Sequence, residues 1–170
     1  NLLANSNIKE KVELNVITDR YGYMLLNKYI KRNTEKYLRK LSIKTNFFEW
    51  SRENLENVCL NSDLAIIPID LKDPMMLGKP ENKLILLWRM GLPAIVGGTP
   101  SYIKIMKEVN QNNYITKKSD WIPKLNELID SKSKREIAGM EGFNYVCKNY
   151  NKEKFIKKWE NLFNSIGFSI

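Results

Sequence analysis

The sequence predicts an α/β fold with a doubly wound, mostly parallel sheet and helices on both faces. Short apolar runs alternate five times with amphipathic stretches of helical spacing, which is the pattern of right-handed β-α-β units. The run over residues 63–70 is too apolar to leave one face in water, as in parallel strands covered on both sides. No repeat, low-complexity tract or linker interrupts the alternation. A single domain over residues 1–170 is therefore expected.

The first half of the chain shows strand and helix signals in alternation. The apolar run over 12–19 ends in Asp19 and predicts a strand, and apolar residues at helical spacing predict a helix over 23–41. Aromatic residues and alternation favour a strand over 43–50, followed by a helix over 54–61 that Ser51 caps. The strand over 63–70 is expected to end at Pro68, which lacks a ladder N–H, and 71–78 to form a loop.

The second half continues the pattern and closes with helices. We expect the following elements: helix 80–90, strand 93–97, helix 100–109, strand 113–116, helix 121–129 with Ser119 as its cap, a helix from 132 onward, and helix 153–166 after a break at 149–151. In an open sheet of this kind, ligands bind beyond the carboxyl ends of the strands. The site is therefore expected among the loops that follow the strands.

Composition narrows the chemistry. The chain has 28 Lys+Arg against 19 Asp+Glu, a net charge of +9, which favours anionic partners. It has no His and only two Cys, Cys59 and Cys147, interpreted as buried thiols in a reducing cytosol, with a disulfide between them as the alternative. A zinc site and Cys-His or Ser-His catalysis are thereby excluded, and no paired-carboxylate motif points to Mg²⁺. No apolar run is long enough to span a membrane and no signal peptide is found, so a cytoplasmic location is expected.

The stretch from Lys79 to Pro100 contains the strongest candidate site. Lys79, Asn82 and Lys83 lie before and within the first turn of a predicted helix, where free backbone N–H groups favour an anion. A cation there costs the helix roughly 0.3–1 kcal/mol, unless an anion neutralises it. The alternative is a solvated basic turn in a lysine-rich protein.

Two further groups of residues follow predicted strands. Gly97 and Gly98 would let the backbone approach a ligand, and Thr99 can donate a hydroxyl or cap the next helix; a tight turn is the alternative. Arg20 could reach a phosphate and Tyr21 could stack on a base or sugar, although ordinary loop roles are more common for such residues.

Three segments together resemble the donor-binding half of bacterial glycosyltransferases of the GT-B fold, group 1 or family 4-like. They are Lys79-Pro80-Glu81-Asn82-Lys83-Leu84, Met90-Gly91-Leu92-Pro93-Ala94-Ile95-Val96 and Thr99-Pro100-Ser101-Tyr102. The resemblance covers the whole chain, since the order of elements and the closing helices also fit. It implies a Rossmann-like C-terminal domain that binds a nucleotide diphosphate-sugar, with the acceptor-binding N-terminal domain absent from this chain.

The chain departs from the pattern of many retaining members of that family. Their two glutamates, eight residues apart, would fall at Gly78 and Leu86, so Asp70, Asp73 or Glu81 is expected to contribute instead. The resemblance implies that Lys79 and Lys83 stabilise the leaving diphosphate without a metal or other cofactor. Asn82 and the amides of Gly97 to Thr99 would assist, Arg20 would be a third cation, and Tyr21 and Tyr102 are candidates to contact base or sugar.

The resemblance further implies hexosyltransferase-like activity in bacterial polysaccharide or glycoconjugate synthesis, with this domain inactive on its own. The partners expected are a nucleotide-sugar and, through the missing domain, an acceptor glycan or lipid-linked glycan. Contact of residues 148–158 with the inner face of the membrane is left open beside a solvated lysine face. The competing hypotheses are a non-catalytic nucleotide-binding or regulatory module and, because of charge and 18 aromatic residues, a nucleic-acid-binding domain.

Overall fold

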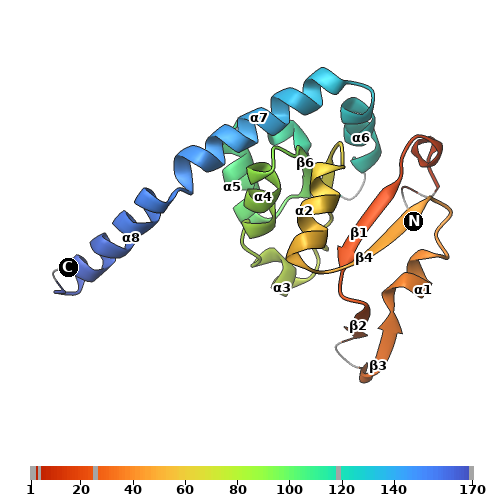
Figure 1. Cartoon of the computed structure of the whole chain (residues 1–170), viewed down its shortest axis with the longest axis horizontal. Helices are drawn as coiled ribbons and strands as arrows, with labels where there is room; N and C mark the ends of the chain where they lie inside the picture. Colours follow the sequence, from red (N-terminus) through yellow and green to blue (C-terminus); the bar gives the residue numbers. More distant parts are fainter. Residues whose placement is uncertain (1–2, 4, 25–26, 118–119, 169–170) are drawn as a thin grey trace.

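The protein is an α/β chain with small, mostly parallel sheets (Figure 1). The computed structural model describes residues 3, 5–24, 27–117 and 120–168. A 3₁₀ turn, η1 (Asn7–Glu10), precedes β1 (Leu14–Thr18), which pairs in parallel with β4 (Thr45–Glu49). Helix α2 (Arg52–Leu60) follows, capped by Ser51 as predicted, and packs on β1.

The second sheet is parallel and has the order β5-β6-β7. Its strands are β5 (Ala65–Ile67), β6 (Ala94–Gly97) and β7 (Ile115–Thr116), which follows the 3₁₀ turn η2 (Asn112–Tyr114). The short helix α3 (Pro74–Leu77) lies in the predicted loop, and α4 (Asn82–Arg89) and α5 (Pro100–Glu108) come before and after β6. Strand β5 ends before Pro68, as predicted.

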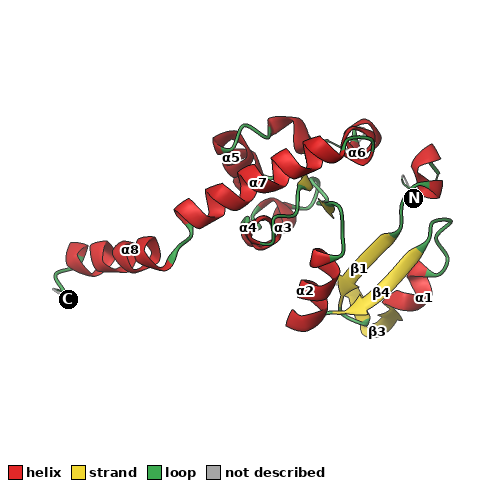
Figure 2. Cartoon of the chain, turned by 45° about the horizontal axis from the view of Figure 1, so that its top comes forward, coloured by secondary structure: helices red, strands yellow, loops and turns green. Residues whose placement is uncertain are grey.

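Three helices close the chain: α6 (Trp121–Ile129), α7 (Lys132–Asn149) and α8 (Lys152–Ser165). The predicted cap of α6, Ser119, lies outside the described residues. Helix α7 packs on α4 and α6, whereas α8 leaves the body from the end of α7 (Figure 2). The core gathers around β6, whose residues are all buried, and includes Leu84 and Trp88 of α4 and Val146 of α7.

The helix predicted over 23–41 is wrong. The chain instead forms a hairpin of β2 (Tyr21–Met24) and β3 (Asn27–Asn33), followed by the short α1 (Thr34–Leu38). Tyr21-Gly22-Tyr23 and the β-branched and aromatic residues of β3 suit paired strands. Asn33 then begins a new helix, because its side-chain oxygen accepts a hydrogen bond from the N–H of Lys36 at 2.9 Å.

The parallel strands predicted from the alternation are confirmed, but they form two sheets. Among the described residues no ladder joins β1 to β5. Strand β5 has only three residues and is followed by Pro68. The edge of β5 that is not paired with β6 is therefore short, and Pro68 has no N–H with which to extend it. The thiol prediction holds for Cys59, which is buried, and is wrong for Cys147, which is exposed on α7; both cysteines are free.

Glycines bring α7 close to α4. A Cβ at Gly139 would lie 2.1 Å from the carbonyl oxygen of Gly91, and one at Gly142 would lie 2.5 Å from the ring of Trp88. Gly91 itself has φ +72° and ends α4, as its place after the predicted helix indicated. The backbones can approach this closely because the two α7 positions carry no side chain.

We expect Gly142→Ala to destabilise the protein by about 1–3 kcal/mol, because the added methyl overlaps the Trp88 ring. Helix propensity acts in the opposite direction, by about 1 kcal/mol in favour of alanine. The exposed Asn144→Ala on the same helix supplies the matched control, since it changes propensity without overlap. Urea unfolding monitored by circular dichroism measures both variants; a Gly142→Ala protein as stable as the Asn144→Ala protein would show that the contact is not tight.

Candidate functional site

The loop between β5 and α4 is organised by its two aspartates. The exposed Asp70 accepts a hydrogen bond on Oδ1 from the N–H of Lys72 at 3.0 Å. Asp73, half-buried, accepts one from the N–H of Met75 at 2.9 Å and so caps α3. Both carboxylates therefore shape the backbone that leads to α4, and Asp70 remains accessible to solvent.

Helix α4 begins with exposed polar side chains. Lys79, Asn82 and Lys83 are all exposed, and the N-cap residue, Glu81, makes no side-chain capping hydrogen bond. Within the part of the chain that the structure describes, no carboxylate forms an ion pair with Lys79 or Lys83. The predicted group of three is thus brought together at an uncapped helix N-terminus that carries two unpaired cations, an arrangement that favours an anion.

The Glu81 side chain turns away from the cap position toward α7. Its Oε1 accepts a hydrogen bond from the hydroxyl of Tyr150 at 3.3 Å. Nearby, the Tyr145 hydroxyl donates to Glu108 of α5, and the Tyr145 and Tyr150 rings lie 6.2 Å apart. The Tyr145 ring also meets Trp88 edge-on at 6.0 Å. Sequence reasoning did not identify Glu108 or Tyr145, because their proximity depends on the packing of α7 and not on any local motif.

Burial and the two glutamates favour the neutral form of these tyrosines. Desolvation, followed by the contact with Glu108, raises the pKa of Tyr145 well above its usual value. Desolvation, followed by the charge of Glu81, raises the pKa of Tyr150 in the same direction. In the neutral form each tyrosine hydroxyl keeps the proton that it donates to its glutamate. Ionisation would remove that hydrogen bond and place a second negative charge beside the carboxylate.

The second expected half of the site is closed. Thr99 is fully buried, and its hydroxyl accepts a hydrogen bond from the N–H of Tyr102 at 3.3 Å, which caps α5. Two of the three amides predicted to serve a ligand are occupied: the N–H of Gly98 donates to the carbonyl of Thr116 at 3.2 Å and that of Thr99 to the carbonyl of Gly97 at 2.9 Å. The capping role predicted for Thr99 is confirmed, and its hydroxyl does not reach the surface because the residue is fully buried.

Gly97 and Gly98 are glycines for reasons of packing. A Cβ at Gly97 would lie 2.9 Å from Cβ of Ile69, and one at Gly98 would lie 3.0 Å from a methyl group of Ile115. Neither glycine has a positive φ. The close approach predicted at these positions exists, but the partner is the neighbouring backbone and side chains of this chain.

The remaining predicted residues lie elsewhere. Arg20 forms ion pairs with Glu49 at 2.9 Å and Glu35 at 3.5 Å, and its guanidinium stands 5.5 Å from the Phe47 ring centre. The contact with Glu49 raises its pKa further. Arg20 is thus neutralised within the β1–β4 sheet, Tyr21 begins β2 with 44% of its surface exposed, and Tyr102 is 1% exposed in the core, out of reach of a ligand.

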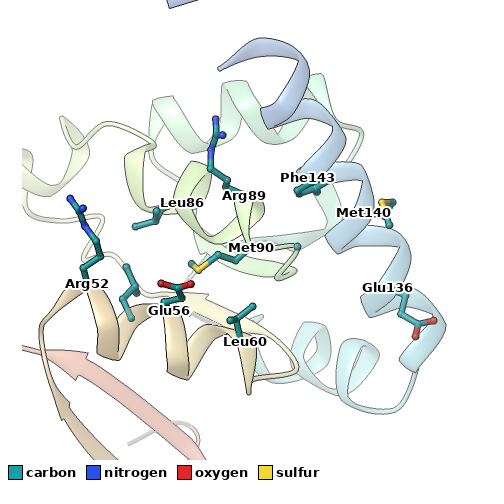
Figure 3. Close-up of a pocket in the computed structure, with 11 residues that line it drawn as sticks. Arg52, Glu56, Leu60, Leu86, Arg89, Met90, Glu136, Met140 and Phe143 are labelled. Carbon is teal, nitrogen blue, oxygen red and sulfur yellow. The ribbon is translucent and has the colours of Figure 1, made fainter. Parts of the chain in front are cut away.

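A pocket of about 680 Å³ opens at the other end of α4 (Figure 3). It lies between α2, α4 and α7, and its lining is mostly apolar, with Leu60, Leu86, Met140 and Phe143 among the contributors. A second pocket, of about 410 Å³, lies between α1 and β4. Neither of these two pockets is lined by Lys79, Asn82 or Lys83, so the candidate anion site is an exposed surface.

Within the described ranges, no three Cys, Asp or Glu residues cluster closely enough to hold a metal ion. The same residues include no helix of the length and apolar character needed to cross a bilayer. Comparison of the chain with family models, curated proteins and solved structures finds no match. The function is therefore argued from the site itself.

Alkaline pH is expected to destabilise the protein. The folded state raises the pKa of Tyr145 and Tyr150 above that of unfolded tyrosine, about 10. Their contribution to stability is thus complete below pH about 10 and is lost as pH rises toward the folded values. Urea unfolding of wild type and Tyr145→Phe between neutral and alkaline pH tests this. The variant should show a shallower loss, and parallel curves would contradict the role given to Tyr145.

Proposed function

We propose that this chain is the nucleotide-sugar donor-binding domain of a GT-B glycosyltransferase, acting in bacterial polysaccharide or glycoconjugate synthesis. The observation that supports it is the pair of unpaired cations, Lys79 and Lys83, at the uncapped start of α4. Neither lysine takes part in an ion pair among the described residues, a property that they share with other lysines of the chain. A diphosphate carries the charge that would neutralise them.

The proposed fold goes further than the two separate parallel sheets. Strands β1 and β4 lie in parallel, as do β5, β6 and β7. We propose that the two sheets follow one another in the doubly wound order β4-β1-β5-β6-β7, with β1 next to β5 although no ladder joins these two strands among the described residues. In that order the direction of strand succession reverses between β1 and β5, and open α/β sheets bind their ligands at such a reversal. The loop that carries Lys79 follows β5 and therefore leaves the sheet at this point.

The proposed chemistry is stabilisation of the leaving nucleoside diphosphate. Charge develops on the diphosphate as the bond from sugar to phosphate breaks, and fixed donors aimed at it lower the barrier. Lys79 and Lys83 supply the cations, and Asn82 with the first-turn amides of α4 supplies neutral donors. The acceptor and any catalytic base would belong to a further domain, so this chain alone binds donor without transferring sugar.

The sugar and ribose contacts need other residues than the family's two glutamates. Gly78 ends α3 and Leu86 faces the apolar pocket with 44% of its surface exposed. Glu81 is held by Tyr150. Asp70 is exposed in the loop that leads from β5 to α4, and we assign it to the donor's hydroxyl groups.

Nucleotide binding is tested by thermal shift with UDP, GDP, TDP, CMP and their sugar conjugates. A ligand present at 100 times its dissociation constant should add about 2.7 kcal/mol of stability. Stabilisation by one nucleoside diphosphate and its sugars supports the proposal. If nucleotides bind but their sugars add nothing, a non-catalytic nucleotide-binding module is the better description. Stabilisation by single-stranded nucleic acid alone would refute both.

The location of the diphosphate is tested with Lys79→Gln and Lys83→Gln. Each should weaken binding of the nucleotide by about 10-fold, the size of one charge-assisted hydrogen bond, without lowering the melting temperature of the free protein. Lys36→Gln and Lys40→Gln, two exposed lysines near α1, remove equal charge far from α4. Affinity that falls equally in both pairs would reflect net charge only, and the diphosphate would lie elsewhere.

A further inference from the structure

Helix α8 extends from the body as an unsupported amphipathic helix. It begins after Tyr150, where Asn151 caps it by accepting a hydrogen bond from the N–H of Lys154 at 2.9 Å. Both views show it projecting beyond α7, at the opposite end of the molecule from α1 and the β2–β3 hairpin (Figures 1 and 2). Of its 14 residues, 13 are exposed and one, Phe163, is half-buried.

One side of α8 is apolar and largely open to solvent. Phe155, Trp159 and Leu162 expose 63%, 47% and 49% of their surfaces. The full set is Phe155, Ile156, Trp159, Leu162, Phe163 and Ile166, where Ile166 follows the helix directly. At 100° per residue these positions fall within an arc of about 120°. An apolar surface of this width and exposure on a water-soluble fold marks an interaction site.

The apolar side is held in a fixed form by its aromatic rings. The Phe155 and Trp159 ring centres are 6.2 Å apart, and those of Trp159 and Phe163 are 5.8 Å apart. The three rings therefore form a ridge along the helix. Trp is the residue most suited to the boundary between water and acyl chains, since its ring is apolar and its N–H is a donor.

The polar side of α8 is basic. The whole helix carries Lys152, Lys154, Lys157 and Lys158 against Glu153 and Glu160, a net charge of +2. At 100° per residue the last three of these lysines lie outside the apolar arc, and Lys152, in the first turn, lies within it. Lys154 and Lys158, one turn apart, border the apolar arc on one side. Both lysine side chains contact the end of α7, from which α8 starts. The Lys154 ammonium donates a hydrogen bond to Asn149 at 2.9 Å, and the Lys158 ammonium lies 6.0 Å from the centre of the Tyr150 ring. This combination of basic and aromatic faces is that of helices lying in an anionic bilayer interface.

We propose that α8 binds the surface of an anionic lipid bilayer, with its axis in the plane of the interface. The ridge of Phe155, Trp159 and Phe163 enters the boundary of the acyl chains, and the lysines meet the headgroups. The charge of +2 on α8, within a chain of +9, attracts an anionic surface and repels a second copy of the same helix. This proposal does not depend on nucleotide binding at α4.

Binding is measured by flotation of the whole chain with phosphatidylcholine vesicles, with and without phosphatidylglycerol. The chain should float with the anionic vesicles and stay behind with the neutral ones, and added salt should weaken the association. The emission of Trp159, obtained as the difference between wild type and Trp159→Phe, should shift to the blue on binding. Equal flotation with neutral and anionic vesicles would overturn the role of the lysines, and no flotation with either would overturn the proposal.

Two double variants separate the apolar and the basic contributions. Phe155→Ser with Ile166→Ser should lower the partition coefficient by about 10-fold or more, because both side chains would otherwise enter the interface. Lys154→Gln with Lys158→Gln should lower it by about 30-fold, from about 5-fold for each lysine near an anionic surface. All four side chains are exposed, so circular dichroism should be unchanged.

Matched controls make the same changes away from α8. Leu60→Ser with Met140→Ser removes apolar surface that is 64% and 59% exposed at the α2–α4–α7 pocket. Lys36→Gln with Lys40→Gln removes two charges in and just after α1, at the opposite end of the molecule from α8. Both should bind vesicles nearly as wild type does. A dimer in sedimentation that the α8 variants, but not these controls, convert to monomer would identify a second copy as the partner and overturn the proposal.

Discussion

Gly139 and Gly142 bring α7 against α4 at a distance that only residues without a side chain permit. Trp88 fills the space opposite them and is fully buried, with Leu84 one turn earlier beside β6. The buried Gln111, which follows α5, donates from its side-chain amide to the carbonyl of Ala138 at 2.8 Å and so ties the opposite layer to α7. The close contact between α4 and α7 therefore positions α4. The hydrogen bond from Gln111 to Ala138 holds the end of α5 against the same helix, α7.

With its inner side fixed by α7, α4 presents two different ends. Lys79, just before the helix, and Asn82 and Lys83 in its first turn are exposed to solvent. At its other end, Arg89 and the C-cap residue Met90 line the apolar pocket. The helix axis runs from a polar, cationic surface to an apolar one. The first end of α4 thus suits a polar, anionic ligand and the other end suits apolar packing. The same helix supports two surfaces of different chemistry.

The sequence predicted the local elements best where composition and capping agree. Ser51, Gly91 and Thr99 mark helix boundaries that the structure shares, because a cap acts within one turn. The helix predicted over 23–41 is wrong because the hairpin depends on pairing between two segments, which apolar spacing within one segment does not report. Of the predicted site residues, Lys79, Asn82 and Lys83 lie together and exposed at the start of α4. The occupied amides of Gly98 and Thr99, the ion pairs of Arg20 and the burial of Tyr102 all depend on contacts between distant segments.

Tyr150 touches α4 at both ends. Its carbonyl oxygen accepts a hydrogen bond from Arg89 at 2.7 Å, in the last turn, and its hydroxyl donates to Glu81 before the first. The same residue is the last before the cap of α8, and Lys158 of that helix stands over its ring. A single residue, through its backbone carbonyl and its side chain, thus connects α8 to both ends of α4, including the end where the diphosphate is proposed to bind. By linkage, if binding at α8 changed the affinity of α4 for its ligand, that ligand would change the affinity of α8 by the same factor.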